Sequence, residues 1–342
     1  MIEQGSDDWL EARQSGLGGS EVSVLYGKNP YMTETVLWLS KTGRIPPTKA
    51  TIHDEPAMYW GTALEKQVRR GYIDLTGRVV EDGVTMLRHS KAPIFANTDG
   101  SIPTAEGQQG PGVYEGKIAG GIVRRRDWEN EGKVRLPLHY QCQLQTYLEC
   151  TGCQWGSLAV LFGDRWDLKA IDVVIDRAFI ADMLARARSW WKERIELDRP
   201  PPVDSSSKTE DALRQVYPRD DGRIVILPDQ FAGVLDRLLA AESMASQIDD
   251  QVQCMRNMVI AAMGPHAIGL LYDGRGFAMR GADGRKLTKL SVDAMAKRRR
   301  AMDRRGAGEP QHVEVHPELQ AQADAIAGIS WGIKPRGEGS ET

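Results

Sequence analysis

The chain has 342 residues, of which 41% are hydrophobic and 27% are charged, and its formal net charge is −3. This composition suits a soluble globular protein with a sizeable core. No apolar stretch is long enough to span a bilayer, and the acidic, polar N-terminus does not resemble a signal peptide. We therefore expect a cytoplasmic protein with no membrane contact. The small negative charge argues against a surface that binds polyanions everywhere, but not against a local groove that does so.

The N-terminal part alternates helical and strand-like patterns. Helices are predicted at 6–13, 20–26, 35–41, 60–75, 136–152 and 177–197. Strands are predicted at 78–88, 113–119, 155–162 and 169–175, and the short apolar run PIFA leads into the turn NTDG. Ser20 is predicted to cap the second helix, because a serine side chain can accept a hydrogen bond from a free backbone N–H there.

The C-terminal part differs in character. The stretch DRPPPVDSSSKT at 198–209 predicts a linker. Residues 230–263 carry apolar side chains three and four residues apart, which is typical of a helical arm that packs on a partner surface. A hairpin with Asp-Gly turns follows, and then a basic run at 295–305 that we interpret as a solvated helix, with contact to DNA or to a partner protein as the alternative. We therefore expect three parts, namely a domain at 1–205, a helical arm with hairpin and basic segment at 206–327, and a flexible tail at 328–342.

The stretch GVYEGKIAG at 112–120 combines a glutamate and a lysine two residues apart. Because side chains alternate along a strand, Glu115 and Lys117 share one face, and Asp99 stands in a turn sixteen residues before Glu115. Two carboxylates from different elements can hold Mg²⁺. A neighbouring lysine can orient or help to deprotonate the attacking water, or stabilise the developing charge, during phosphodiester hydrolysis. The triplet alone is more often an exposed ion pair, so the context has to decide.

Six motifs occur in a fixed order between residues 4 and 205: GSDDWLEARQSGLGGSEV, WGTALE, ANTDG, YEGK, QCQLQTYL and RPPPVD. In this order they resemble the phage lambda exonuclease family, in particular the YqaJ-type viral recombinase nucleases with a PD-(D/E)xK core. The resemblance implies an α/β fold with a central mixed sheet flanked by helices, and the C-terminal helical arm and β-hairpin resemble an extension found in YqaJ-type phage proteins.

The resemblance also implies roles for the residues of the triplet. Asp99 and Glu115 would be the principal metal ligands, with help from a backbone carbonyl near Gly116 or Ile118, and Lys117 would be the catalytic lysine. The metal would be Mg²⁺ or Mn²⁺. The glycine between Glu115 and Lys117 departs from the family pattern, which usually has an apolar side chain there, and so leaves open what fills the space.

Two further residues match the family near the metals. Glu65 matches a helix glutamate that helps to hold a second metal, although it could instead form an i,i+4 ion pair with Arg69. Gln143 matches a glutamine beside the metals, but Gln141 and Gln145 lie so close in sequence that the register stays open.

Three basic or polar features are candidates for contact with DNA. Arg13 and Ser20 match residues that bind the 5′ phosphate of a DNA end, and an arginine fork suits a phosphate chemically. The alternative for Arg13 is an ordinary surface helix residue. The run Arg124, Arg125 and Arg126 follows the predicted metal strand, and contact with the DNA backbone and a solvated loop are equally good explanations of it.

The resemblance implies a 5′→3′ exonuclease that degrades one strand of linear double-stranded DNA and leaves 3′ single-stranded tails. Its partners would be DNA ends and a single-strand annealing protein, it would be encoded by a phage or prophage, and a homo-oligomer such as a trimeric ring is expected from lambda-family relatives.

Other functions on the same sequence are an endonuclease, a RecB-like nuclease, and a non-catalytic scaffold that binds DNA ends. The RecB-like type normally adds cysteines for an iron–sulfur cluster, one of them near the N-terminus, whereas this chain has no cysteine before Cys142. A scaffold would be expected to lose a metal ligand, and an incidental triplet in a structural phage protein is the remaining alternative.

Overall fold

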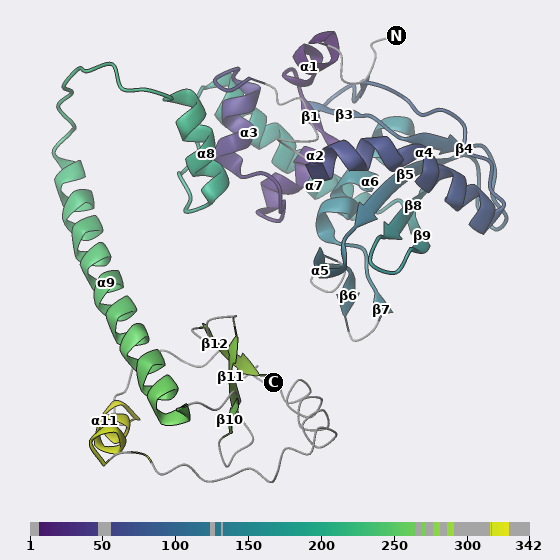
Figure 1. The fold of residues 1–342 in the computed structure, drawn as a ribbon. Coiled ribbons are helices and arrows are strands. Elements are labelled where there is room, and N and C mark those ends of the chain that lie inside the picture. The colour runs from purple at the N-terminus through teal and green to yellow at the C-terminus, as the bar shows by residue number, and fades with distance from the viewer. Residues whose placement is uncertain are drawn as a thin grey trace, which may run out of the picture. The chain divides into compact units, whose positions relative to one another are not determined.

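The computed structural model describes residues 7–46, 56–123, 127–130, 133–264, 268–270, 276–280, 286–290, 315 and 317–327 (Figure 1). The chain divides into two compact units, which are described separately: Met1–Gly222 and Arg223–Thr342.

A four-stranded mixed sheet forms the centre of the first unit (Figure 1). The strand order is β4-β5-β8-β9, with β5 and β8 parallel and the two outer pairs antiparallel. This confirms the predicted mixed sheet. The strands are β4 (Gly100–Ile102), β5 (Gly112–Ala119), β8 (Trp155–Phe162) and β9 (Asp167–Val174).

Two helices cover opposite faces of this sheet: α4 (Pro56–Thr76) and α6 (Leu138–Thr151). Tyr72 of α4 packs against Tyr114 of β5 on one face, with ring centroids 4.9 Å apart. Leu144 of α6 belongs to the core on the other face, together with Leu158 and Val160 of β8. Strand β8 is therefore buried on both faces, which explains its nearly continuous apolar sequence.

A second core lies beside the sheet and is built from the N-terminal segments and helix α7. A small sheet of order β1-β3-β2 belongs to this region. The elements of this region are α1 (Asp7–Arg13), β1 (Leu17–Gly18), α2 (Gly19–Val22), η1 (Ser23–Tyr26), α3 (Glu34–Lys41), β2 (Leu87–Arg88), β3 (Ile94–Ala96), α7 (Arg177–Trp190) and η3 (Trp191–Glu196). After β5, the short helix α5 (Gly121–Val123) and a two-stranded sheet of β6 (Glu129–Asn130) and β7 (Lys133–Val134) follow in the chain.

The first unit extends past the predicted boundary at residue 205. Helix α8 (Ser207–Val216) packs on α3, where Ala212 joins the core of Leu39 and Ile45. The hydroxyls of Thr33 and Thr209 are hydrogen-bonded at 2.8 Å. The Pro- and Ser-rich stretch before α8 is thus part of the unit rather than a linker, because buried apolar contacts on both of its sides hold it in place.

The segment at 78–88 is not the predicted strand or strand pair. Only β2, at its end, and a single bridge between Glu81 and Ser101 are strand-like. Side chains make several of its other contacts: the guanidinium of Arg78 donates to Asp172 of β9 at 2.7 Å, and the backbone N–H of Val84 donates to the hydroxyl of Thr98 at 3.0 Å. The alternating pattern thus does not produce a continuous strand ladder here.

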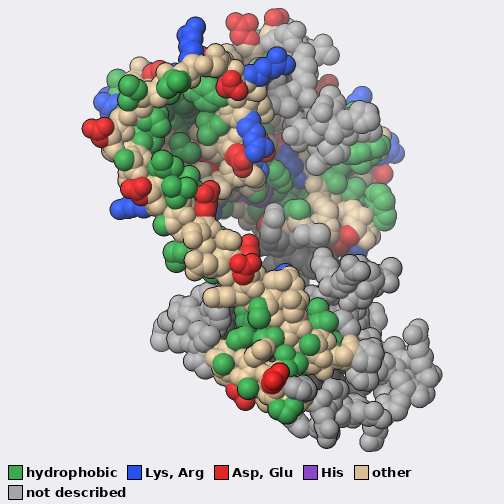
Figure 2. All heavy atoms as spheres, turned by 60° about the vertical axis from the view of Figure 1, so that its left-hand side comes forward, with side chains coloured by type: hydrophobic (Ala, Val, Ile, Leu, Met, Phe, Trp, Pro, Cys, Tyr) green, Lys and Arg blue, Asp and Glu red, His purple; other side chains and the backbone are tan. Residues whose placement is uncertain are grey.

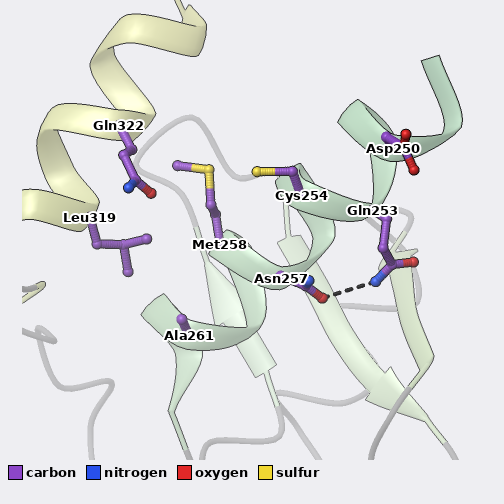
Figure 3. Close-up of a pocket in the computed structure, with 8 residues that line it drawn as sticks. All are labelled: Asp250, Gln253, Cys254, Asn257, Met258, Ala261, Leu319 and Gln322. Carbon is purple, nitrogen blue, oxygen red and sulfur yellow. Dashed lines mark hydrogen bonds between the residues drawn. The ribbon is translucent and has the colours of Figure 1, made fainter. Parts of the chain in front are cut away.

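The second unit contains the long helix α9 (Gln230–Met263), which confirms the predicted helical arm. The predicted hairpin is present as β11 and β12, with β10 added in an antiparallel sheet. Helix α11 lies near the end of α9, and Figure 3 shows a hollow between them with Cys254 and Met258 on one wall and Leu319 on the other. The bounds are β10 (Ile268–Leu270), β11 (Gly276–Arg280), β12 (Lys286–Leu290) and α11 (Pro317–Ala327).

The basic run at 295–305 and the tail at 328–342 lie outside the described residues. Within the described part, no helix combines the length and the apolar character that crossing a bilayer requires.

Candidate active site

Strand β5 points Glu115 and Lys117 toward helix α6, as the strand period predicts. Only 1% of Glu115 is exposed. One of its oxygens, Oε1, accepts hydrogen bonds from the ammonium of Lys117 and, at 2.6 Å, from the side-chain amide of Gln143. The pair is therefore not the ordinary surface ion pair of an exposed strand, since a buried carboxylate receives two donors from two elements.

The helix phase of α6 settles which glutamine faces the strand. Gln143 bonds Glu115, and its amide also lies 2.7 Å from the hydroxyl of Tyr147 one turn later. Gln145 is buried elsewhere, where it donates to the carbonyl of Val174 and accepts from the N–H of Asp176. The structure thus brings together Gln143 and Glu115, and gives Gln145 a structural role at the end of β9.

Asp99 immediately precedes β4, which pairs with β5 through Gly100 and Tyr114. Its carboxylate accepts the backbone N–H of Gly116 at 2.8 Å. Burial and the nearby charge of Asp99 raise the pKa of Glu115 to about 8. The carboxyl groups of Glu115 on β5 and of Asp99 just before β4 therefore stand close enough to repel each other when both are ionised.

The same two carboxylates also determine the protonation state of Lys117. Burial would lower the pKa of Lys117, but Glu115 and Asp99 more than offset it, so its pKa is raised. Lys117 therefore remains an ammonium, a form that donates hydrogen bonds and carries charge but accepts no proton.

The donors present suit a hard divalent cation. The second oxygen of Glu115, Oε2, is buried and receives no hydrogen bond from any described residue. The carboxyl group of Asp99 lies close to that of Glu115. Across the described ranges, no three His, Cys, Asp or Glu side chains are grouped as a metal site. A site here would thus rest on two carboxylates, with water or backbone oxygens completing the shell, which is a set that Mg²⁺ accepts.

Glu65 reaches the same region from α4. It lines a hollow of ≈ 300 Å³ together with Asp99 and Thr98. Burial and the charge of Asp99 raise the pKa of Glu65. Arg69, the candidate ion-pair partner one turn later, pairs with Asp82 at 3.2 Å and donates to the carbonyl of Val80. Glu65 is therefore oriented toward the carboxylate region but does not complete a cluster of three.

The glycine in the motif has a neighbour that explains it. A side chain at Gly116 would begin 3.2 Å from the hydroxyl of Tyr114 and 3.6 Å from Val68 of α4. The Tyr114 ring is completely buried, so the space that an apolar side chain would occupy is filled by the tyrosine two residues earlier on the same face.

Arg13 and Ser20 stand at a second cluster, built on Glu21. Glu21 accepts from the guanidinium of Arg13 at 2.6 Å and pairs with the ammonium of Lys41 at 2.7 Å. Arg13 also stacks on the ring of Trp9, 4.8 Å from its centroid. Burial would raise the pKa of Glu21, but Lys41 and Arg13 together hold it at about 2. The three charged groups carry a net charge of +1.

Ser20 does not cap its helix. The N-cap of α2 is Gly18, whose N–H donates to Glu21 at 2.7 Å, and Ser20 is an exposed residue in the first turn. The correction follows from the capping box, in which the glutamate at the third helical position satisfies the backbone and replaces the serine that the sequence suggested.

Helix α6 forms a wall shared by the two clusters. A side chain at Gly19 of α2 would meet the ring of Tyr147 at 2.7 Å and the carbonyl of Gln143 at 3.2 Å. Because Gly19 has no side chain, the segment that carries the Arg13 cluster can pack closely against α6, the helix whose Gln143 bonds Glu115.

Residues 8–154 match the sequence profile of the YqaJ-like viral recombinase domain. This part of the chain is similar to the YqaJ-like viral recombinase domain. The match contains Asp99, Glu115 and Lys117 as well as Arg13 and Gln143, so the site described above lies wholly inside it. The resemblance drawn from the motifs is thereby confirmed.

The chain is similar in sequence to an uncharacterized protein, and solved exonuclease structures resemble part of its fold. YqaJ of Bacillus subtilis (strain 168), an uncharacterized protein, is 27% identical over 266 residues, which span 73% of this chain and 78% of its own. The alkaline exonuclease LHK-Exo from Laribacter hongkongensis is 22% identical, covering 61% of this chain and 97% of its own with a TM-score of 0.41. A phage-related exonuclease from Haemophilus somnus 129PT is 9% identical, covering 54% and 96% with a TM-score of 0.37.

Three residues around the site of the YqaJ-like domain were not singled out from the sequence. Glu21 belongs to the quoted motif GLGGSEV, and a glutamate three residues after the capping Gly18 is a capping-box signal that could have found it. Lys41 and Tyr147 carry no such signal, because only the tertiary packing brings them to Glu21 and Gln143. The run Arg124, Arg125 and Arg126 lies outside the described residues.

Proposed function

We propose that the YqaJ-like domain is a divalent-metal-dependent nuclease that degrades one strand of linear double-stranded DNA from its 5′ end. The observation that carries the proposal is the buried carboxyl group of Glu115, which has one oxygen free of described donors, faces Asp99 and lies under Lys117 and Gln143. A buried acid in this state costs stability unless a cation or proton is shared with its neighbour. The family match supports a role in recombination.

The residues of the chain have distinct roles in the proposed reaction. Mg²⁺ or Mn²⁺, held by Asp99 and Glu115 with Glu65 oriented toward them, would activate a water and stabilise negative charge on the phosphate oxygens. Lys117, which is kept protonated, donates to the attacking water or to the developing negative charge. Gln143 fixes the rotamer of Glu115 through its 2.6 Å hydrogen bond. Because Glu115 must lose a proton to bind a cation, metal binding is expected to weaken below about pH 8.

The cluster at Arg13 supplies the proposed preference for a 5′ phosphate. Its net charge of +1 is presented by Arg13, the least buried of the three charged side chains, with 28% exposed against 6% for Glu21 and 2% for Lys41. Glu21 orients the guanidinium, and the exposed hydroxyl of Ser20 is available as an added donor. The product would be a 3′ single-stranded tail, which is the substrate of a single-strand annealing protein, and we propose such a protein as the partner.

The proposal is tested by incubating the full chain with linear duplex DNA and with closed circular duplex, each with Mg²⁺ and with a chelator. We expect Mg²⁺-dependent loss of the linear substrate alone, with label released first from the 5′ end. Digestion of closed circles would indicate an endonuclease, and an absence of digestion on every substrate would indicate a scaffold that binds DNA ends.

Replacing Arg13 by alanine is expected to remove the preference for phosphorylated ends. We expect the rate on a 5′-phosphorylated duplex to fall roughly tenfold or more, since a charge-assisted pair is lost, while the rate on a 5′-hydroxyl duplex changes little. The measurement is the ratio of initial rates on the two duplexes.

Arg44→Ala is the matched control, because Arg44 also pairs with a carboxylate, at 2.8 Å from Asp198, and also lies over a tryptophan ring, that of Trp38. It should leave the ratio as in the unaltered chain. An Arg13→Ala chain that still prefers phosphorylated ends would refute the assignment of Arg13.

A further inference from the structure

Helix α9 carries an unbroken heptad seam. It is continuous over its 34 residues, so it is roughly 50 Å long at 1.5 Å per residue. Starting at Phe231, apolar residues recur at alternating steps of three and four without exception, as the a and d positions of a coiled coil require. The a positions are Phe231, Leu238, Ala245, Val252 and Val259, and the d positions are Val234, Ala241, Ile248, Met255 and Ala262.

The first half of this seam lies open within the second unit. Phe231, Val234, Leu238 and Ile248 are between 47% and 58% exposed. Figure 2 brings the left-hand side of Figure 1 forward, and hydrophobic side chains are exposed on that side. A single exposed leucine is ordinary, but a row of large apolar side chains in heptad register along one face of a helix is typical of an interface.

Helix α11 does not take the place of a coiled-coil partner. Figure 3 shows the residues of α9 that line the hollow beside α11, which are Asp250, Gln253, Cys254, Asn257, Met258 and Ala261. All of them except Met258, at position g beside the seam, occupy the heptad positions b, c and f, which point away from the a/d seam. From Val252 onward the seam residues are half-buried, whereas Phe231, Val234, Leu238 and Ile248 before it stay exposed.

The charged residues beside the seam favour pairing of α9 with a second copy of itself in parallel rather than antiparallel orientation. In a parallel pair, Arg237 at position g faces Glu242 at position e of the partner, and the two attract each other. In an antiparallel pair that keeps the full seam, Glu242 would face Asp249, and the two carboxylates would repel each other in both symmetry-related places. All three of these side chains are exposed.

We infer that α9 self-associates with α9 of a second copy of this chain as a parallel coiled coil. The inference rests on the heptad register, the open apolar side chains and the complementary charges of the second unit, and it does not depend on the proposed nuclease activity. It assigns the helical arm, for which no partner was identified from the sequence, to contact between copies.

The test compares two neighbouring leucines of the full chain. Leu238 is 51% exposed at an a position, and Leu239 is 55% exposed at a b position outside the seam. We expect Leu238→Asp to raise the dissociation constant of self-association roughly tenfold or more, since it buries a charge, and Leu239→Asp to leave it unchanged. Sedimentation velocity gives the dissociation constant, and circular dichroism checks that both variants keep their helix.

A cross-linking experiment tests the orientation. In a chain with Cys254 replaced by serine, Leu238→Cys should form a covalent dimer under mild oxidation, because an a residue faces its own copy only in the parallel arrangement. Ser243→Cys, at position f, is the control that should not cross-link. A monomeric unaltered chain, equal effects of Leu238→Asp and Leu239→Asp, or cross-linking at Ser243→Cys alone would each overturn the inference.

Discussion

Replacing Lys117 by alanine is expected to lower the turnover number on linear duplex by roughly 10²–10⁴-fold, the range for loss of a positioned proton donor or charge stabiliser. The protein should still fold and bind DNA ends, because Glu115 can take up a proton when its ammonium partner is removed, as its raised pKa of about 8 allows. Single-turnover digestion and a separate end-binding assay give the two quantities.

Strand β9 provides a control for the same residue pattern. Lys169 pairs with Asp167 two residues earlier at 2.9 Å, but 47% of the lysine side chain is exposed, against 24% for Lys117. Lys169→Ala removes the same charge from an ordinary surface pair, so activity should stay within about twofold of the unaltered chain. Full activity in Lys117→Ala, or an equal loss in both variants, would exclude Lys117 from the site.

The largest expected loss of stability is at Glu21. Replacing it by glutamine keeps the shape but leaves the ammonium of Lys41, whose side chain is 2% exposed, without its carboxylate. We expect the free energy of unfolding to fall by about 3–5 kcal/mol, as when one partner of a buried pair is removed. Urea unfolding measures it. Glu210→Gln, which breaks the exposed pair with Arg214, should cost about 1 kcal/mol or less.

The difference in the free energy of unfolding between the unaltered chain and Glu21→Gln should depend on pH. The pKa of Glu21 is lowered to about 2 in the fold, so its carboxylate contributes stability that is fully present above its ordinary pKa of 4.5 and is lost as the pH falls toward 2. The shift corresponds to about 3 kcal/mol. Unfolding free energies of the two chains should therefore converge on acidification, and a constant difference from pH 6 to pH 3 would contradict the assignment.

Local periodicity predicted much of the candidate site. The strand period placed Glu115 and Lys117 on one face, and the turn before β4 placed Asp99 beside them. Neither depends on distant parts of the chain. For Gln143 the sequence left three neighbouring glutamines open, because the phase of a buried helix against a sheet is fixed by packing on both sides and not by its own pattern.

Features that depend on contacts between distant segments could not be read from the sequence. The ion pair of Lys41 with Glu21 joins residues of two separate helices. The first unit extends beyond the predicted boundary at residue 205 because Ala212 packs near α3, which is far away in the sequence. Composition alone predicted that the preceding Pro- and Ser-rich stretch is a linker. Composition reports the local stiffness of a segment, but not whether a partner surface is present.

The register of β4 against β5 has a consequence for access to the candidate site. The two strands pair only from Gly112 to Tyr114, so β5 continues for five more residues, to Ala119, without β4 beside it. Asp99 takes over at this point by accepting the N–H of Gly116. The hollow beside Asp99 is bordered where β4 has not yet begun, by Glu65 of α4 and by Asp82, Gly83 and Thr85 of the irregular segment before β2. Access to the carboxylates therefore depends on a helix and on this segment as well as on the sheet.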